Sequence, residues 1–244
     1  MRGSRSARHL RTGAVTAASL GVFLRYGPAL SSIAAIRRGP YRYLLGEGRD
    51  DHLALTFDDG PDPLSTPLIL NELDRLSLTA TFFMLGSMAE ANPSVVHEVL
   101  SAGHEVAVHG NWHRNHLFRS ARTIRYDIER AVGTLGAICG TTPTYFRPPY
   151  GVATRPTLLT ASQLALKPVL WGAWGRDWRR LATPTSVLHD VKKDLRPGTT
   201  ILLHDADCTS YPGSFRATLG ALRPLAELCE ENRLQLGPLR EHGF

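Results

Sequence analysis

Two adjacent carboxylates, Asp58 and Asp59, stand directly after an apolar run that extends from Leu53 to Phe57. Because neighbouring carboxylates repel each other, such a pair needs a compensating cation or a shared proton. The turn-forming residues 60–63 follow at once, and Asp, Gly and Pro are also common in solvated turns. The pair alone therefore leaves two interpretations open, a cation site and an ordinary polar turn.

Two histidines, His109 and His113, lie four positions apart, at and just after the end of a strand-like segment at 105–109. If the segment forms one turn of helix, both imidazoles face the same side, as a shared metal ion requires. Two histidines and one carboxylate form a common three-ligand set that leaves a position for water and substrate. The alternative is a polar loop that happens to be rich in histidine, since His104 and His116 lie nearby.

The segment Arg147-Pro-Pro-Tyr-Gly151 predicts a rigid loop, because proline fixes the backbone and glycine permits close approach. A rigid loop can hold a backbone N–H in place to stabilise an oxyanion. Its arginine can also pair with a carboxylate and keep that group ionised. The plainer interpretation is that two prolines simply end a strand.

His204 ends a second apolar run, 201–203. A single histidine in an apolar segment is usually a hydrogen-bonded core residue, but it can also act as a general acid that protonates a leaving amine. Asp177 would then be a suitable carboxylate partner that raises the imidazole pKa, with Trp178 as an apolar wall beside it.

Short apolar runs alternate with amphipathic segments after residue 50, which predicts a parallel sheet with crossing helices. Seven such units indicate a barrel or near-barrel, and an open doubly wound sheet is the alternative. The polar residues described above all follow strands, and barrels collect their catalytic groups at the C-terminal ends of strands. The strands are expected at 53–57, 79–83, 105–109, 144–146, 168–171, 200–204 and 234–236, and the helices at 66–76, 93–102, 124–138, 156–166, 184–195 and 215–231.

The formal net charge of +6 belongs to an N-terminal arm, residues 1–46, which has eight arginines and no acidic residue. The rest of the chain has 20 of the 28 basic side chains against 22 acidic ones. Because nucleic-acid binders carry basic charge on the folded domain, a nucleic-acid partner is not expected. Two weakly apolar stretches, 12–24 and 29–36, flank Arg25. A signal segment, a membrane anchor and a packed amphipathic helix therefore all stay open for this arm.

The remainder of the chain, 50–240, is expected to form a single catalytic domain beyond a polar, glycine-containing junction at 46–51. The 43% hydrophobic content is sufficient for a sizeable core. Cys139, Cys208 and Cys229 are odd in number and lack ligand spacing, so neither a disulfide framework nor a cysteine metal site is predicted.

Five segments, taken in this order, resemble the polysaccharide deacetylases of carbohydrate esterase family four, which contain NodB-type domains. The resemblance covers about 50–240 and implies a distorted (β/α)7 barrel that hydrolyses N-acetyl groups on a peptidoglycan-like or chitin-like glycan. The matching segments are Thr56-Phe-Asp-Asp-Gly60, His109-Gly-Asn-Trp-His113, Arg147-Pro-Pro-Tyr-Gly151, Asp177-Trp178 and Leu202-Leu-His204.

At the matching positions, the resemblance implies that Asp59, His109 and His113 hold a divalent metal, most often zinc in this family. It also implies that Asp58 is the general base that activates water. Arg147 would orient Asp58 and keep it charged.

The same resemblance implies that His204 protonates the departing amine, with Asp177 tuning its pKa. The backbone N–H of Tyr150 would help to hold the oxyanion. Trp178 and Tyr150 would pack against a sugar face or the acetyl methyl group.

The sequence departs from the family pattern at two positions. Trp174 stands where a second aspartate often precedes the Asp-Trp pair, and Gly110 replaces a Ser or Thr after the first histidine. Two other functions are weighed against deacetylation of an amide. One is hydrolysis of an O-acetyl ester or a small cyclic amide, and the other is an inactive glycan-binding domain, which the intact five segments disfavour. We expect a monomer that is secreted or located at the cell envelope, with a cytoplasmic location as the alternative. Membrane association through the arm is one of the interpretations left open above.

Overall fold

The computed structural model describes residues 21–244. Its strands are β1 (His52–Asp58), β2 (Thr81–Met84), β3 (Glu105–Val108), β4 (Tyr145–Phe146), β5 (Lys167–Pro168), β6 (Ala173–Trp174), β7 (Thr200–His204) and β8 (Gln235–Gly237). The longer helices are α3 (Ser65–Arg75), α4 (Gly86–Ala91), α5 (Pro93–Ser101), α6 (Ala121–Cys139), α7 (Arg155–Gln163), α8 (Pro184–Asp194) and α9 (Phe215–Glu231). Short helical turns are η1 (Gly27–Ser32), α2 (Ala34–Arg37), η2 (Arg42–Leu44), η3 (His116–Phe118), η4 (Pro149–Gly151) and η5 (Leu239–Glu241).

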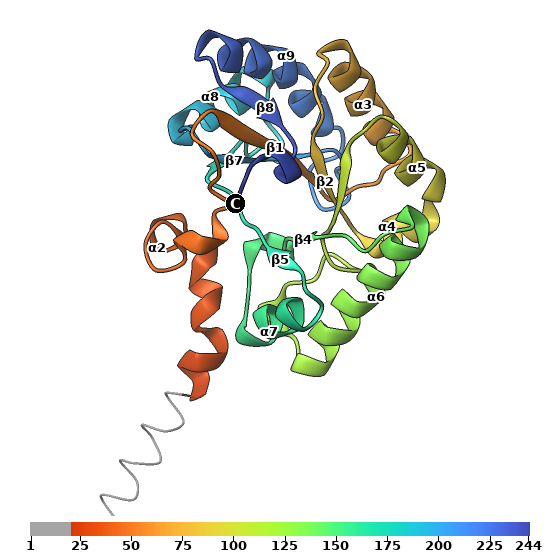
Figure 1. The fold of residues 1–244 in the computed structure, drawn as a ribbon, viewed down its shortest axis with the longest axis vertical. Coiled ribbons are helices and arrows are strands. Elements are labelled where there is room, and N and C mark those ends of the chain that lie inside the picture. Colours follow the sequence, from red (N-terminus) through yellow and green to blue (C-terminus); the bar gives the residue numbers. More distant parts are fainter. Residues whose placement is uncertain (1–20) are drawn as a thin grey trace, which may run out of the picture.

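All the strands run parallel in the order β5-β4-β3-β2-β1-β7-β6, and β8 pairs with the start of β1. The helices lie around the outside of the strands (Figure 1). The predicted α/β barrel is confirmed, in a curled form whose sheet is not hydrogen-bonded between β5 and β6 within the described residues.

One strand and one helix were not predicted. β6 has two residues between Gly172 and Gly175, and its two apolar side chains are too few to show a period. The apolar run 168–171 is correspondingly not one strand, since the pairing ends with Pro168. α4 is likewise too short for helical periodicity to be recognised. The other helices have the expected positions within a few residues.

Both faces of β1 are buried, which is typical of a strand in a parallel sheet covered by helices. Leu53, Leu55 and Phe57 belong to the large core between strands and helices. Ala54, on the opposite face, belongs to a small cluster inside the barrel. The register with β7 places Asp58 opposite His204, so that two predicted catalytic residues end neighbouring strands.

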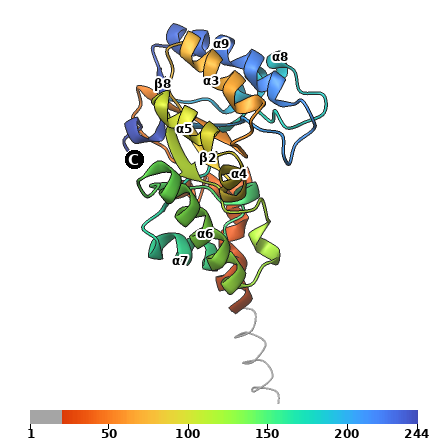
Figure 2. The ribbon, with the colours of Figure 1, turned by 90° about the vertical axis from the view of Figure 1, so that its right-hand side faces the viewer.

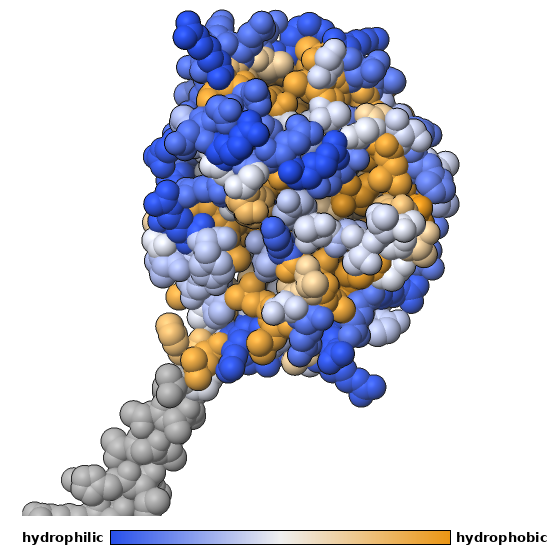
Figure 3. All heavy atoms as spheres, viewed as in Figure 1, coloured by the Kyte–Doolittle hydropathy of each residue, from blue (hydrophilic) through white to orange (hydrophobic). Residues whose placement is uncertain are grey.

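The arm, within its described residues, runs beside the barrel and leads away at the end occupied by α6 and α7 (Figures 1 and 2). Val22, Phe23 and Leu24 are exposed there, and Figure 3 shows apolar surface near this end of the arm. Among residues 21–244, no helix has the length and apolarity needed to cross a membrane. Much of the first apolar stretch of the arm lies outside the described residues.

Candidate active site

The predicted catalytic residues meet at the C-terminal ends of the strands. Asp58 ends β1 and Asp59 follows it, while His204 ends β7. His109 and Arg147 directly follow β3 and β4. A pocket with a volume of about 290 Å³ opens onto Asp58, His109 and His204. Its lining comprises Ser32, Asp58, His109, His113, Tyr150, Gly151, Trp171, Trp174, Trp178, Leu202, His204, Thr209 and Ser210.

The side chains of Asp59, His109 and His113 converge on one point. Asp59 Oδ1 lies 3.4 Å from Nε2 of His109 and 3.3 Å from Nε2 of His113. This oxygen is buried and has no hydrogen-bond partner within the described part of the chain. One potential ligand atom from each residue lies within 4.8 Å of the other two. A buried carboxylate oxygen without a donor, facing two imidazole nitrogens, fits the requirements of a divalent cation.

The protonation of the two histidines also suits a cation. His109 Nδ1 lies 2.9 Å from the carbonyl oxygen of Arg147, so Nδ1 is the donor nitrogen and Nε2 is the nitrogen that faces the potential cation site. Burial lowers the pKa of His113 to about 4, which leaves this ring neutral at pH 7. Asp59 has a left-handed backbone with φ of 82°, and such strained residues are concentrated at functional sites.

Arg147 is fully buried and holds Asp58 through a charge-assisted bond of 2.6 Å from Nη1 to Oδ1. The same nitrogen donates to Thr56 Oγ1, and the other two guanidinium nitrogens donate to the carbonyls of Val169 and Leu170. These bonds fix the arginine from several directions. Asp58 therefore has one oxygen bound by the arginine, while Oδ2 lies 3.8 Å from His109 Nε2, beside the potential cation site.

His204, which lines the pocket, is paired with the buried Asp177. The His204 ring Nδ1 lies 2.8 Å from Asp177 Oδ1. The other carboxylate oxygen accepts from the His204 backbone N–H at 2.7 Å and from Thr218 Oγ1 at 2.6 Å. Burial by itself would lower the pKa of His204, but the charge and hydrogen bond of Asp177, together with the charges of Asp59 and Asp58, outweigh burial and raise that pKa to about 10. The imidazole is thus a cation at neutral pH, with Nε2–H left for a substrate.

Aromatic side chains form the walls of the pocket. Three tryptophans form a row. The ring centroids of Trp171 and Trp174 lie 5.5 Å apart, and those of Trp174 and Trp178 lie 6.2 Å apart. Tyr150 is exposed and meets the His113 ring edge-on at 4.3 Å. Its backbone is left-handed, with φ of 60°, at the point where the rigid loop passes the pocket. Trp174, the departure from the family pattern, therefore lies in the wall itself.

The second departure, Gly110, has a structural explanation. Its φ is +88°, in the region that glycine adopts without strain, and a Cβ there would lie 2.8 Å from Asp127 Oδ2. Asp127 accepts the backbone N–H groups of Asn111 at 3.0 Å and of Trp112 at 3.2 Å. This carboxylate therefore supports the loop between the two histidines.

Sequence reasoning missed Asp127 and Thr209. Asp127 lies on the buried face of α6, between Ile124 and Ile128, and a lone carboxylate on an otherwise apolar helix face was a usable signal. Thr209 Oγ1 donates to Asp59 Oδ2 at 2.7 Å. It belongs to an irregular loop after β7, where no sequence pattern marks it.

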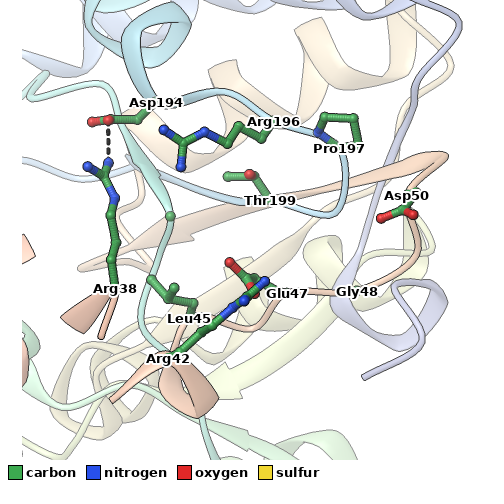
Figure 4. Close-up of a pocket in the computed structure, with 11 residues that line it drawn as sticks. Arg38, Arg42, Leu45, Glu47, Gly48, Asp50, Asp194, Arg196, Pro197 and Thr199 are labelled. Carbon is green, nitrogen blue, oxygen red and sulfur yellow. Dashed lines mark hydrogen bonds and ion pairs between the residues drawn. The ribbon is translucent and has the colours of Figure 1, made fainter. Parts of the chain in front are cut away.

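Another pocket, with a volume of about 360 Å³, lies at the opposite end of the strands, near the residues that precede β1, β6 and β7 (Figure 4). Its charged groups largely neutralise each other. Arg38 pairs with Asp194, and Arg42 pairs with Glu47 at 2.6 Å. None of the predicted catalytic residues lines this pocket, so the chemistry belongs to the other end of the barrel.

Comparison with known proteins shows the family of this chain. A family model described as polysaccharide deacetylase matches residues 46–169, just over half of the chain. The chain belongs to the polysaccharide deacetylase family. This deacetylase is therefore a hydrolase of carbon–nitrogen bonds other than peptide bonds. It is 33% identical over 192 residues to a chitooligosaccharide deacetylase of Azorhizobium caulinodans, with 76% of this chain and 91% of that protein covered.

Two further relatives support the same family. The deacetylase is 37% identical over 165 residues to a peptidoglycan-N-acetylglucosamine deacetylase of Bacillus cereus, with 63% of this chain and 72% of that protein covered. A solved structure of a peptidoglycan N-acetylglucosamine deacetylase bound to a naphthalenyl N-oxidanyl-benzamide superposes with a TM-score of 0.74 and 28% identity. That match covers 81% of this chain and 91% of the other. The predicted family and fold are confirmed.

Proposed function

We propose that this deacetylase removes N-acetyl groups from N-acetylglucosamine units of a peptidoglycan-like or chitin-like glycan. The observation that carries the proposal is the convergence of three potential metal ligands with a base, Asp58, and an acid, His204, around one pocket. The choice of substrate is supported by two relatives, which are named as a chitooligosaccharide deacetylase and a peptidoglycan-N-acetylglucosamine deacetylase.

Asp59, His109 and His113 would hold the cation, and zinc is the ion that best suits two imidazoles and one carboxylate. When bound, such an ion polarises an acyl oxygen and makes water easier to deprotonate. Thr209 and the carbonyl of Arg147 orient the ligands from behind, through bonds to Asp59 and His109.

The protein's own groups then supply both proton transfers. Asp58 takes a proton from the attacking water, and the bond from Arg147 fixes the orientation of this carboxylate. The backbone N–H of Tyr150 stabilises the charge that develops on the acetyl oxygen. His204 gives a proton to the amide nitrogen as the carbon–nitrogen bond breaks, so that acetate and a free amino sugar result.

The Asp177→Asn variant is expected to shift the alkaline limb of kcat/KM for an N-acetyl substrate to lower pH. Asp177 makes the largest contribution among the carboxylates that raise the pKa of His204 to about 10, so the acid stays protonated through neutral pH and loses its proton as the pH approaches that value. Without the carboxylate charge, the imidazole loses its proton at a lower pH. Rates measured from pH 6 to 10 check this, with Asp190→Asn, a carboxylate on α8 paired with Arg179, as the control. An unshifted alkaline limb would contradict the assignment of His204.

The Thr209→Val variant is expected to weaken zinc binding by about 10–100-fold, as the loss of a group that orients a ligand typically does. The dissociation constant is measured by competition with a chromogenic chelator, independently of turnover. Thr209→Ser restores the donor and should restore affinity. Thr185→Val, at an exposed position on α8, is the matched control. Equal affinities in Thr209→Val and the wild type would overturn this positioning role.

The function itself is tested by acetate release from N-acetylchitooligosaccharides and from purified cell wall. The enzyme is assayed as isolated, after chelation, and after chelation with zinc restored. Release that chelator abolishes and zinc restores is the expected result. No release from either glycan by the zinc-loaded enzyme would contradict the proposal and favour a small-molecule amide as substrate.

We place this activity at the cell envelope or outside the cell, because the B. cereus relative is named for peptidoglycan, an envelope polymer. The exposed apolar residues Val22, Phe23 and Leu24, next to Arg25, suit contact with an anionic membrane surface. The division into an arm, 1–46, and a catalytic domain, 50–240, stays a prediction, as does the monomeric state.

A further inference from the structure

The part of the arm from residue 27 to residue 45 lies before the segment that the family model matches, yet it is built into the barrel. The carbonyl of Leu44 accepts from Leu170 N–H at 2.6 Å, just after β5. The carbonyl of Gly46 accepts from Thr200 Oγ1 at 2.6 Å, at the start of β7. These bonds place the arm in the gap that the sheet leaves between β5 and β6.

Side-chain packing strengthens this attachment. The Arg37 guanidinium is buried and lies 4.4 Å from the centre of the Trp171 ring, a cation–π contact. Trp171 in turn belongs to the pocket wall. Leu44 packs in one buried cluster with Leu170, Trp171 and Leu202. The arm therefore contacts the wall of the active site from behind.

The same attachment brings η1 against η4, the turn that carries Tyr150. Ser32, the last residue of η1, consequently lines the active-site pocket together with Gly151, Trp171 and Trp174. Its hydroxyl donates a hydrogen bond to the carbonyl oxygen of Ala29, within the same helical turn, at 2.8 Å. This part of the pocket wall is therefore a small side chain whose hydroxyl is already hydrogen-bonded. At about 290 Å³, the pocket is at the small end of the usual range for ligand sites, where one side chain changes what fits.

We propose that η1 forms one wall of the substrate site and that Ser32 determines how much of the glycan next to the reacting sugar can enter. A sugar ring packed on the apolar face of Trp174 lies between this tryptophan and the arm. Serine leaves room for that neighbouring unit, whereas a large side chain fills it. This inference rests on the proposed function, since it concerns the substrate of the same site.

The test is the Ser32→Trp variant, assayed on a series of chitooligosaccharides from dimer to pentamer and on 4-nitrophenyl acetate. The small ester reaches the same catalytic groups without occupying the neighbouring space. We expect kcat/KM for the pentamer to fall at least about tenfold, mainly through KM, and kcat/KM for the ester to change less than about twofold. Ser32→Leu should give an intermediate loss, and it serves as the test if the tryptophan variant does not fold.

Ile33→Trp is the matched control, because this residue of the same arm is half exposed and does not line the pocket. It should leave the pentamer-to-ester ratio unchanged. A wild-type ratio in both Ser32 variants would overturn the inference, as would an equal fall in Ile33→Trp, which would indicate a loosened arm. If the wild type binds these glycans without releasing acetate, the proposed function fails separately. The role of Ser32 is then tested by binding: the dissociation constant for the pentamer should rise more than that for the dimer in Ser32→Trp or Ser32→Leu, and an equal change for both would overturn the inference.

Discussion

Replacement of Asp58 by Asn is expected to lower kcat for acetate release by about 10²–10⁴-fold and to leave bound zinc in place. Of the adjacent carboxylates Asp58 and Asp59, only Asp59 belongs to the cluster of potential metal ligands. Asn can still accept from Arg147 Nη1, so the bond that fixes this side chain survives while the basic oxygen is lost. Structure and cation are thereby retained, and only the proton acceptor is removed.

The contrasting variant is His113→Ala, which removes one ligand nitrogen and should lose both zinc and turnover. Metal content per chain is measured on purified protein after dialysis, and acetate release is measured on the same samples. Thermal unfolding shows whether Asp58→Asn is folded, since an altered partner for the buried Arg147 has a cost. Loss of zinc in Asp58→Asn, or its retention in His113→Ala, would show that the two roles have been assigned wrongly.

Replacement of His204 by Ala is expected to separate amide from ester substrates. An amine leaves poorly without a proton, so kcat for an N-acetyl glycan should fall by about 10²–10⁴-fold. The phenolate of 4-nitrophenyl acetate leaves without a proton, and its hydrolysis should fall much less. The loss of the ring also leaves Asp177 buried with only Thr218 Oγ1 and a backbone N–H as partners, so folding is checked first.

Both substrates are assayed with the zinc-loaded variant, and His189→Ala, at an exposed position on α8, is the control. Equal losses on amide and ester would mean that His204 does not protonate the leaving group. The amide-selective loss is the pattern that supports deacetylation of an amino sugar.

Much of the site could be anticipated because its residues stand where strong local patterns end. Asp58 and His204 terminate uninterrupted apolar strands, and the C-terminal ends of parallel strands meet at one end of a barrel. The direct pairing of β1 with β7, which sets these two residues opposite each other, depends on contacts between strands distant in sequence. The order of strands was therefore not predictable from local periodicity.

The parts that escaped prediction are held by tertiary contacts alone. Thr209 reaches Asp59 from a loop whose path is set by bonds such as Tyr211 N–H to Trp178 O. The docking of the arm was equally hidden, because its apolar residues at 29–36 fit several kinds of segment equally well. Only the gap between two very short strands, β5 and β6, shows where this segment is accommodated.

The arm's position in the barrel has a consequence for proteolytic trimming. A cut upstream of residue 27 would spare every contact from Ser32 to Gly46, whereas a cut after residue 46 would remove them all at once. Stability and substrate choice would then change together in a single event. A shortened form that keeps its melting temperature must retain these residues, which mass spectrometry of the intact protein can establish.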